Sequence, residues 1–336
     1  MPRGIPGEIY FRGGDPWPET TSNHIQGYAR YGDWHIITHS NSEREGHPWF
    51  IYFHKDIDIE EEKYESIRAS SPDGNRYAHP GGIQIIGDFL VGASTGHDIY
   101  NSLIWMYDLS NLDEVAYWTP SPSTSLHPQQ PPQVKHKIIK NYDRDDAAAV
   151  GIADLRPDIL YNSHEYTLYE DSLATGSQRK YMLAVHAYGY FFDIYISDPT
   201  NSLWDASFNY ATRIMTSYEY DGIALTLDTN GDVWLFGFRG EGDGVTWYDS
   251  FVDVWKLTKD DPYSTSSRGD KAISGSLQKV QELSVDRQNE VAYWHISTRY
   301  GTSLQVLSGN RIVITATERN IHTDDGPTHI NTFQKR

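Results

Sequence analysis

The stretch His79-Pro-Gly-Gly-Ile-Gln-Ile-Ile-Gly-Asp-Phe-Leu-Val-Gly-Ala-Ser-Thr95 decides the fold of this chain. Two runs rich in apolar and β-branched residues flank a Gly-Asp pair, which is the composition of two strands joined by a tight turn. The same arrangement recurs at Gly32-Asp33, Gly231-Asp232 and Gly309-Asn310. A hairpin that returns at long spacing predicts a protein assembled from equivalent β units.

Further runs after each hairpin extend the repeating unit to four strands. Third strands are predicted at Trp49–His54, Leu103–Asp108, Phe191–Asp198 and Phe251–Leu257. The pentapeptide Glu114-Val-Ala-Tyr-Trp118 recurs as Glu290-Val-Ala-Tyr-Trp294, and it is expected to mark the fourth element of two units. A weaker unit begins at Ala149 and is expected to have its second strand at Tyr181–His186.

Five such units predict an all-β fold, a five-bladed β-propeller in a single domain. The expected blades are residues 24–76, 79–142, 147–216, 221–297 and 299–336. The last unit lacks one strand, and the run at residues 7–13 is expected to supply it and close the ring. The alternatives are a double-sheet sandwich and a six-bladed ring in which residues 158–170 form part of an extra blade.

Amino-acid composition excludes several classes of protein and of ligand. The 336 residues include 46 acids, 28 bases and no cysteine, so the net charge is −18. The missing cysteines exclude disulfide scaffolds, iron–sulfur clusters and thiol nucleophiles. Strong acidity argues against nucleic-acid binding, which needs basic surfaces, and favours neutral or cationic ligands. With no transmembrane run and no visible signal peptide, we expect a soluble chain without membrane contact, as a monomer or homodimer.

The blade pattern resembles the five-bladed β-propeller architecture over nearly the whole chain. Families with this shape include glycoside hydrolases related to arabinanases and invertases, a calcium-dependent nucleotidase and the tachylectin-type sugar-binding proteins. Those glycosidases place an Asp at the start of the first blade's inner strand, where this sequence has His24. The resemblance implies the shape, and because the activities of these families differ, function has to be argued from the residues.

Propeller geometry predicts where a site lies. The first strands begin, and the second strands end, around one end of the central channel, so residues from all five units are expected to meet there. His24, His79 and His186 hold comparable places in three blades, and the chain contains 14 histidines. They are candidates for catalytic acid/base chemistry or for ligands of a divalent metal ion. Hydrogen bonding between blades is the alternative role.

Other side chains are expected at the same end of the channel. Asp221 and Glu241 are the candidate catalytic carboxylates, since paired acids suit glycoside hydrolysis. The candidate substrate-binding residues are cationic, aromatic or imidazole side chains: Arg239, Arg299, Tyr300, His39, His97, Tyr188 and Trp247.

These residues favour an enzyme with acid/base chemistry, a lyase, hydrolase or isomerase, acting on a carbohydrate or similar small polar substrate. The alternative is a non-catalytic, lectin-like propeller with equivalent sugar pockets between blades. The five units differ in length and in the residues at the site end, which favours a single active site.

Overall fold

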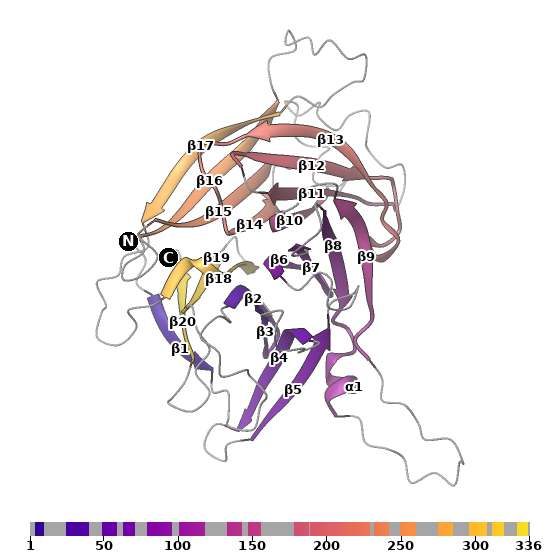
Figure 1. Ribbon diagram of the computed structural model, residues 1–336, viewed down its shortest axis with the longest axis vertical. Helices are drawn as coiled ribbons and strands as arrows, with labels where there is room; N and C mark the ends of the chain where they lie inside the picture. Colours follow the sequence, from indigo (N-terminus) through magenta and orange to yellow (C-terminus); the bar gives the residue numbers. More distant parts are fainter. Residues whose placement is uncertain are drawn as a thin grey trace.

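The protein is a ring of four-stranded sheets. The computed structural model describes residues 4–9, 25–39, 49–58, 63–70, 79–95, 101–117, 133–142, 147–155, 178–187, 189–228, 232–241, 249–259, 275–284, 296–307, 311–318 and 328–334. Within these ranges the sheets surround a common centre, with β2, β6, β10, β14 and β18 innermost (Figure 1). The five-bladed β-propeller predicted from the repeats is confirmed, and a double-sheet sandwich is excluded.

Each blade is an antiparallel meander whose strands follow one another in the sequence. The first blade contains β2 (Ile25–Tyr31), β3 (Trp34–His39), β4 (Trp49–Asp58) and β5 (Lys63–Ser70). The second contains β6 (His79–Ile86), β7 (Phe89–Thr95), β8 (Ser102–Asp108) and β9 (His136–Tyr142). The third contains β10 (Ala147–Leu155), β11 (Lys180–Ala187), β12 (Phe191–Ser197) and β13 (Phe208–Met215).

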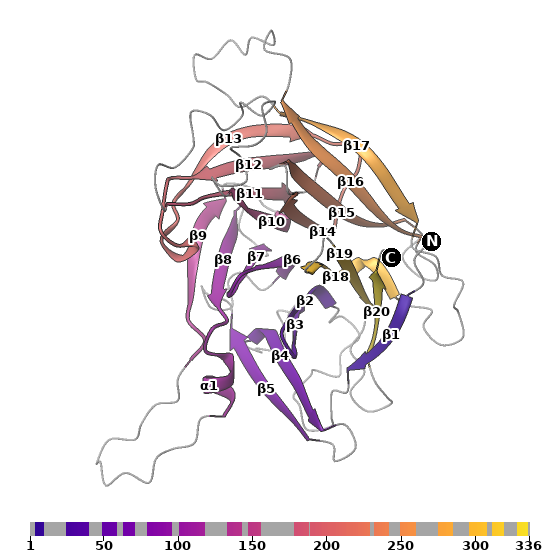
Figure 2. The same cartoon turned by 180° about the vertical axis from the view of Figure 1, so that it is seen from behind.

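The fourth blade follows the same order, and the fifth draws on both ends of the sequence. The fourth contains β14 (Gly222–Leu227), β15 (Val233–Glu241), β16 (Asp249–Lys259) and β17 (Gly275–Ser284). The fifth contains β18 (Ile296–Leu307), β19 (Arg311–Glu318), β20 (Thr328–Gln334) and β1 (Gly4–Ile9). β1 pairs with β20 from Gly4↔Phe333 to Ile9↔Thr328, so the predicted closure by the N-terminal strand is confirmed (Figure 2).

Tight turns set the hairpins, as the Gly-Asp pairs predicted. Gly32 and Gly87 have φ values of 57° and 56°, a left-handed conformation that a glycine adopts without steric cost. Tyr31 then pairs with Trp34 across the first turn. The apolar side chains that alternate along the strands fill the spaces between neighbouring blades, where Trp105 is fully buried.

The innermost strands approach one another closely at glycines. Each of them carries at least one glycine at a close approach: Gly27, Gly82, Gly151, Gly222 and Gly301. A β carbon on Gly82 would lie 3.0 Å from Cα of Gly222, which is tighter than most contacts that a β carbon makes. Gly82 also pairs with Ala149, and this parallel pairing joins the second and third blades into one eight-stranded sheet.

One strand prediction is wrong. In the first copy of the repeated pentapeptide, the residues from Glu114 to Ala116 lie in helix α1 (Leu112–Ala116) and Tyr117 follows it as a turn residue, whereas the fourth strand of the second blade is β9. Asp113 and Glu114 lie in the first turn of this helix, where acidic side chains favour the helix dipole, and Leu112 packs into the core. The second copy, residues 290–294, and the possible extra blade at 158–170 lie outside the described residues. No described helix is long and apolar enough to cross a membrane.

Candidate functional site

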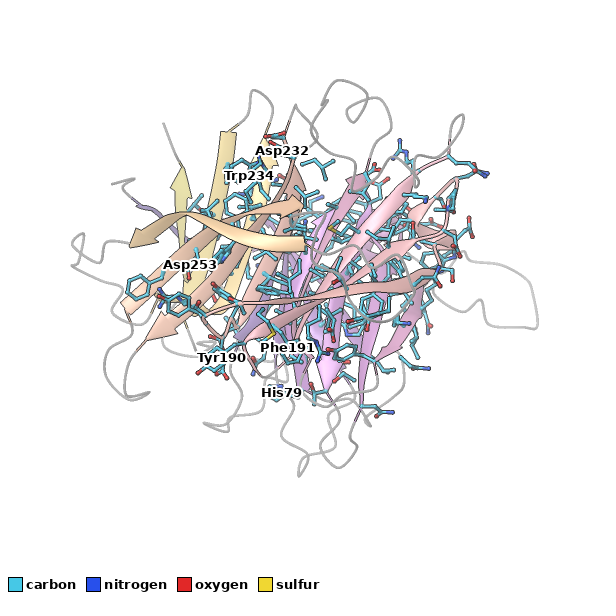
Figure 3. The ribbon with its side chains drawn as sticks, turned by 90° about the horizontal axis from the view of Figure 1, so that it is seen from above. His79, Tyr190, Phe191, Asp232, Trp234 and Asp253 are labelled. Atoms are coloured by element: carbon cyan, nitrogen blue, oxygen red, sulfur yellow. The ribbon has the colours of Figure 1, made fainter. Side chains whose placement is uncertain are left out.

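Strand register divides the ring into two faces. The first residue of each inner strand lies beside the end of the second strand, as in His79↔Thr95 and Ala147↔Ala187. We call this end the loop face, and the end with the Gly-Asp turns the turn face. Figure 3 shows His79 and Tyr190 on one side of the molecule and Asp232 and Trp234 on the other. The predicted site residues therefore have to be sought on the side of His79.

His79 is exposed at the start of β6 on the loop face. Its Nε2 lies 3.2 Å from Nε2 of Gln26, which belongs to the innermost strand of the first blade. Either nitrogen of a neutral imidazole can take part in such a hydrogen bond, as donor or as acceptor, depending on the tautomer. The contact joins two blades beside the central axis and orients the imidazole. Gln26 was not among the sequence candidates, although it lies two residues after His24.

The fourth blade contributes two acidic residues to the loop face. Asp221 immediately precedes β14, its backbone N–H donates to the carbonyl oxygen of Phe238 at 3.1 Å, and it is partly exposed. Glu241 is the last residue of β15 and pairs with Asp249. A β carbon on Gly82 would lie 3.1 Å from the carbonyl oxygen of Asp221, so the strands that begin near His79 and Asp221 meet at the axis.

His186 is placed differently from the sequence expectation of a proton carrier or metal ligand. It is buried, its Nδ1–H donates to the carbonyl oxygen of Phe191 at 2.8 Å, and its Nε2 accepts the N–H of Tyr220 at 2.9 Å. Both ring nitrogens are thus occupied by backbone groups. Burial lowers the pKa of this imidazole from 6.5 to about 4, so it remains neutral at physiological pH. Its geometry is that of a link between blades.

Arg239 is likewise removed from the loop-face surface. Only 5% of its side chain is exposed, and its Nε donates to Oδ2 of the fully buried Asp253 at 2.8 Å. The guanidinium lies between the rings of Tyr218 and Phe251, 4.0 and 4.3 Å from their centroids. An arginine neutralised and covered in this way holds the blade together and does not present its charge to a substrate. The sequence indicates the strand on which Arg239 lies, but it does not indicate that the side chain is buried.

The other sequence candidates divide into two groups. His24, His97, Tyr188 and Trp247 lie outside the described residues. For His39, Glu241, Arg299 and Tyr300 the strand position is described, and each stands on the loop-face half of its blade. Among the described residues, no group of three or more histidines, cysteines or acids is arranged to hold a metal ion. The histidine metal site stays a prediction, since one of its three residues is not described.

Exposed apolar side chains follow the loop-face end of the third blade. Tyr190 is 55% exposed and Met215 is 67% exposed. The carbonyl oxygen of Tyr190 accepts the N–H of Thr216 at 2.8 Å, which holds the segments of these two residues together. An exposed aromatic ring such as that of Tyr190 offers a flat surface on which a sugar ring can stack. The Tyr-Gly-Tyr sequence at 188–190 is the feature of the sequence that points to this surface, but only its first tyrosine was among the predicted substrate-binding residues.

Comparisons with known proteins return no matching family and no matching curated protein. Among solved structures, an α-L-arabinanase of Penicillium chrysogenum in complex with arabinobiose aligns at 11% identity and a TM-score of 0.44, over 99% of this chain and 98% of that one. A family GH43 endo-arabinanase of Bacillus licheniformis aligns at 11% identity and 0.44, over 96% of both chains. A GH32 β-fructofuranosidase of Bombyx mori aligns at 10% and 0.38, over 91% of this chain and 58% of that one. Similarity at this level assigns neither a family nor an activity.

Proposed function

We propose that the protein is an enzyme that acts on a carbohydrate at the loop face of the propeller, by acid/base chemistry, and that hydrolysis of a glycosidic bond is its reaction. The observation that carries the proposal is the exposed His79, held by Gln26 of the neighbouring blade beside the channel axis. Imidazole is the side chain that exchanges protons most readily near neutral pH. A fixed orientation for such a ring is what general acid/base catalysis requires.

The acidic residues of the fourth blade supply the second part of the proposal. Asp221 immediately precedes β14 and Glu241 ends β15, so both positions stand at the same end of the fourth blade. Hydrolysis of a glycosidic bond is normally carried out by two carboxyl groups, one of which donates a proton to the leaving oxygen. In the proposed site these two residues flank the scissile bond, and His79 exchanges protons with the substrate or with water.

Charge and exposed aromatic surface support a sugar as the substrate. The net charge of −18 disfavours polyanionic substrates and is compatible with neutral glycans. Tyr190 offers an aromatic face on the same side of the molecule as His79 (Figure 3). The differences between blades on the loop face favour one catalytic site over repeated lectin pockets.

The test measures product release from neutral polysaccharides and oligosaccharides built of arabinose, xylose, glucose or fructose. For the active substrate, we expect His79→Ala and Asp221→Asn each to lower kcat/KM by about 100-fold or more. His136→Ala is the matched control, because His136 is also exposed but lies on the outer strand β9. Its activity is expected to equal that of the unchanged protein.

Three results would contradict the proposal. Binding on a glycan array without product from any bound glycan would show a lectin-like protein. Products with an unsaturated sugar, or an isomerised sugar without bond cleavage, would replace hydrolysis by lyase or isomerase chemistry. Full activity of a folded His79→Ala protein would remove the histidine from the mechanism.

A further inference from the structure

A cavity of about 570 Å³ lies at the turn face, at the opposite end of the channel from His79. All five innermost strands contribute to its lining: residues 29–31 of β2, 84–86 of β6, 152–154 of β10, 225–227 of β14 and 303–305 of β18. Gly32 and Gly87 lie at its edge. Its volume is within the range of about 300–1,000 Å³ that is typical of small-molecule sites.

The side-chain amide of Gln84 forms the inner end of this cavity. Its Nε2 donates to the carbonyl oxygens of Ile152 and Leu225 at 2.9 and 2.8 Å, and its Oε1 accepts the N–H groups of the same two residues at 2.8 and 3.0 Å. All four hydrogen-bonding positions of the amide are therefore used. Gln84 lies between the close approach at Gly82 and the turn face, so it separates the cavity from the loop-face site.

The lining combines hydroxyl and amide groups with aliphatic side chains. Thr226, Ser303 and Gln305 are among the polar members, and Leu227 and Leu304 are among the aliphatic ones. Such a surface matches a molecule that carries hydroxyl groups on its edges and C–H groups on its faces. The inner edges of β2, β14 and β18 are also sheet edges, whose backbone groups can bind hydroxyls.

Hydrogen bonds hold the charged and phenolic side chains beside the cavity. Asp154 accepts from Arg179 at 3.1 Å, and the Nε of Arg30 donates to the carbonyl oxygen of Gly32 at 3.0 Å. The Tyr31 hydroxyl donates to Asp88 at 2.8 Å, and burial together with this acid raises the pKa of Tyr31 to about 12, so the phenol stays neutral. The lining itself has one cation, Arg30, and one anion, Asp154. It therefore suits a neutral ligand.

We propose that this cavity is a second ligand site, separate from the catalytic site, for a neutral, hydroxyl-rich small molecule of monosaccharide or disaccharide size. A molecule bound there contacts all five blades at once. Because it binds only the closed ring, it also stabilises the folded protein, by an amount that rises with the logarithm of its concentration above the dissociation constant. The proposal does not depend on the enzymatic function.

The test uses the full chain with labelled isoleucine and leucine methyl groups, titrated with glucose, xylose, maltose and sucrose, and with glucuronate as an acidic probe. Resonances of Ile86, Leu227 and Leu304 report on the cavity, and Ile25, at the start of β2, reports on the loop face. We expect saturable shifts of the cavity resonances with at least one neutral sugar. Gln305→Trp, at an exposed lining position, should weaken this binding about tenfold or more.

Two controls accompany the blocking variant. Gln133→Trp makes the same change at an exposed residue that does not line the cavity, and His79→Ala alters only the loop face. Both are expected to leave the cavity affinity unchanged. The proposal fails if no neutral sugar shifts the cavity resonances, if only glucuronate does, or if folded Gln305→Trp binds as tightly as the unchanged protein. Shifts confined to Ile25 overturn the second site while leaving the catalytic proposal standing.

Discussion

The third and fourth blades each contain a buried aspartate paired with an arginine. The two clusters consist of the same residue types, but the arginine lies on a different strand in each. Asp193 lies in Phe191-Phe-Asp193 on β12, and Asp253 lies in Phe251-Val-Asp253 on β16, so both acids occupy the third strand. In each cluster an arginine pairs with the acid and covers the ring of the phenylalanine two residues before it, at 4.0 Å from Phe191 and 4.3 Å from Phe251.

The arginines come from opposite sides of the third strand. Arg213 lies on the fourth strand, contacts Asp193 through two nitrogens at 2.7 and 2.8 Å, and keeps 31% of its side chain exposed. Arg239 lies on the second strand, closer to the axis, and only 5% of its side chain is exposed. The comparison teaches that one acidic position can be neutralised from either neighbour. The strand from which the arginine comes determines how much of the arginine side chain is exposed to water.

The largest difference in stability between the two clusters is expected when the arginine is replaced. Arg239→Met leaves the fully buried carboxylate of Asp253 without its cation, and we expect a loss of about 3–5 kcal/mol in the free energy of unfolding. Arg213→Met should cost about 1–2 kcal/mol, since water can replace the exposed guanidinium. Denaturant unfolding measures both values. Equal losses would show that exposure of the arginine does not control the energetics.

The hydrogen bonds of His186, one of which joins the third blade to the fourth, should make stability depend on pH. His186 of the third blade accepts the backbone N–H of Tyr220, whose hydroxyl donates to Asp253. The pKa of His186 is about 4 in the folded protein, against 6.5 for a solvated histidine, so the unfolded chain binds the proton more tightly. Its contribution is therefore complete above about pH 6.5 and is lost as the pH falls toward 4, by up to about 3 kcal/mol.

Unfolding free energies of the unchanged protein and His186→Gln, measured between pH 4 and pH 7.5, test this dependence. The difference between the two curves isolates the imidazole from the carboxylates that also titrate. We expect the unchanged protein to lose its advantage over the variant as the pH falls. A difference that is constant with pH would show that His186 titrates alike in both states.

Removing the tyrosine hydroxyl from each cluster is expected to give the smallest difference in stability between them. Tyr142 donates to Asp193 at 2.6 Å, whereas the Tyr220 hydroxyl donates to Asp253 at 3.0 Å and accepts from Trp255 Nε1 at 2.9 Å. Tyr142→Phe should cost about 1 kcal/mol, and Tyr220→Phe about 2 kcal/mol, because the second change also leaves a buried indole N–H without this acceptor. Thermal unfolding measures both losses. A greater loss for Tyr142→Phe would reverse the order.

Local sequence patterns were enough to predict the fold. The roles of individual site residues were not predictable in the same way, because they depend on burial and hydrogen bonds that neighbouring blades provide. The Gly-Asp turns and β-branched runs are local signals, so they located the hairpins and the ring. His186 and Arg239 were placed at the correct ends of their strands, but burial and hydrogen bonding depend on neighbouring blades. Likewise, the pentapeptide repeat gave no indication of the helix that begins at Leu112. The recurring Phe-x-Asp in third strands was visible in the sequence and was not used.

The pairing of β1 with β20 has a consequence for the order in which the protein can fold. Ile9 and Thr328 are partners in the same sheet, yet ribosomes make Ile9 long before they reach Thr328. β1 must therefore wait as an unpaired strand while the other blades form, and the entropy of closing so long a loop slows the final step. Until then the nascent chain exposes a sheet edge that other chains can join. Dilute conditions or a chaperone during synthesis should therefore favour correct closure.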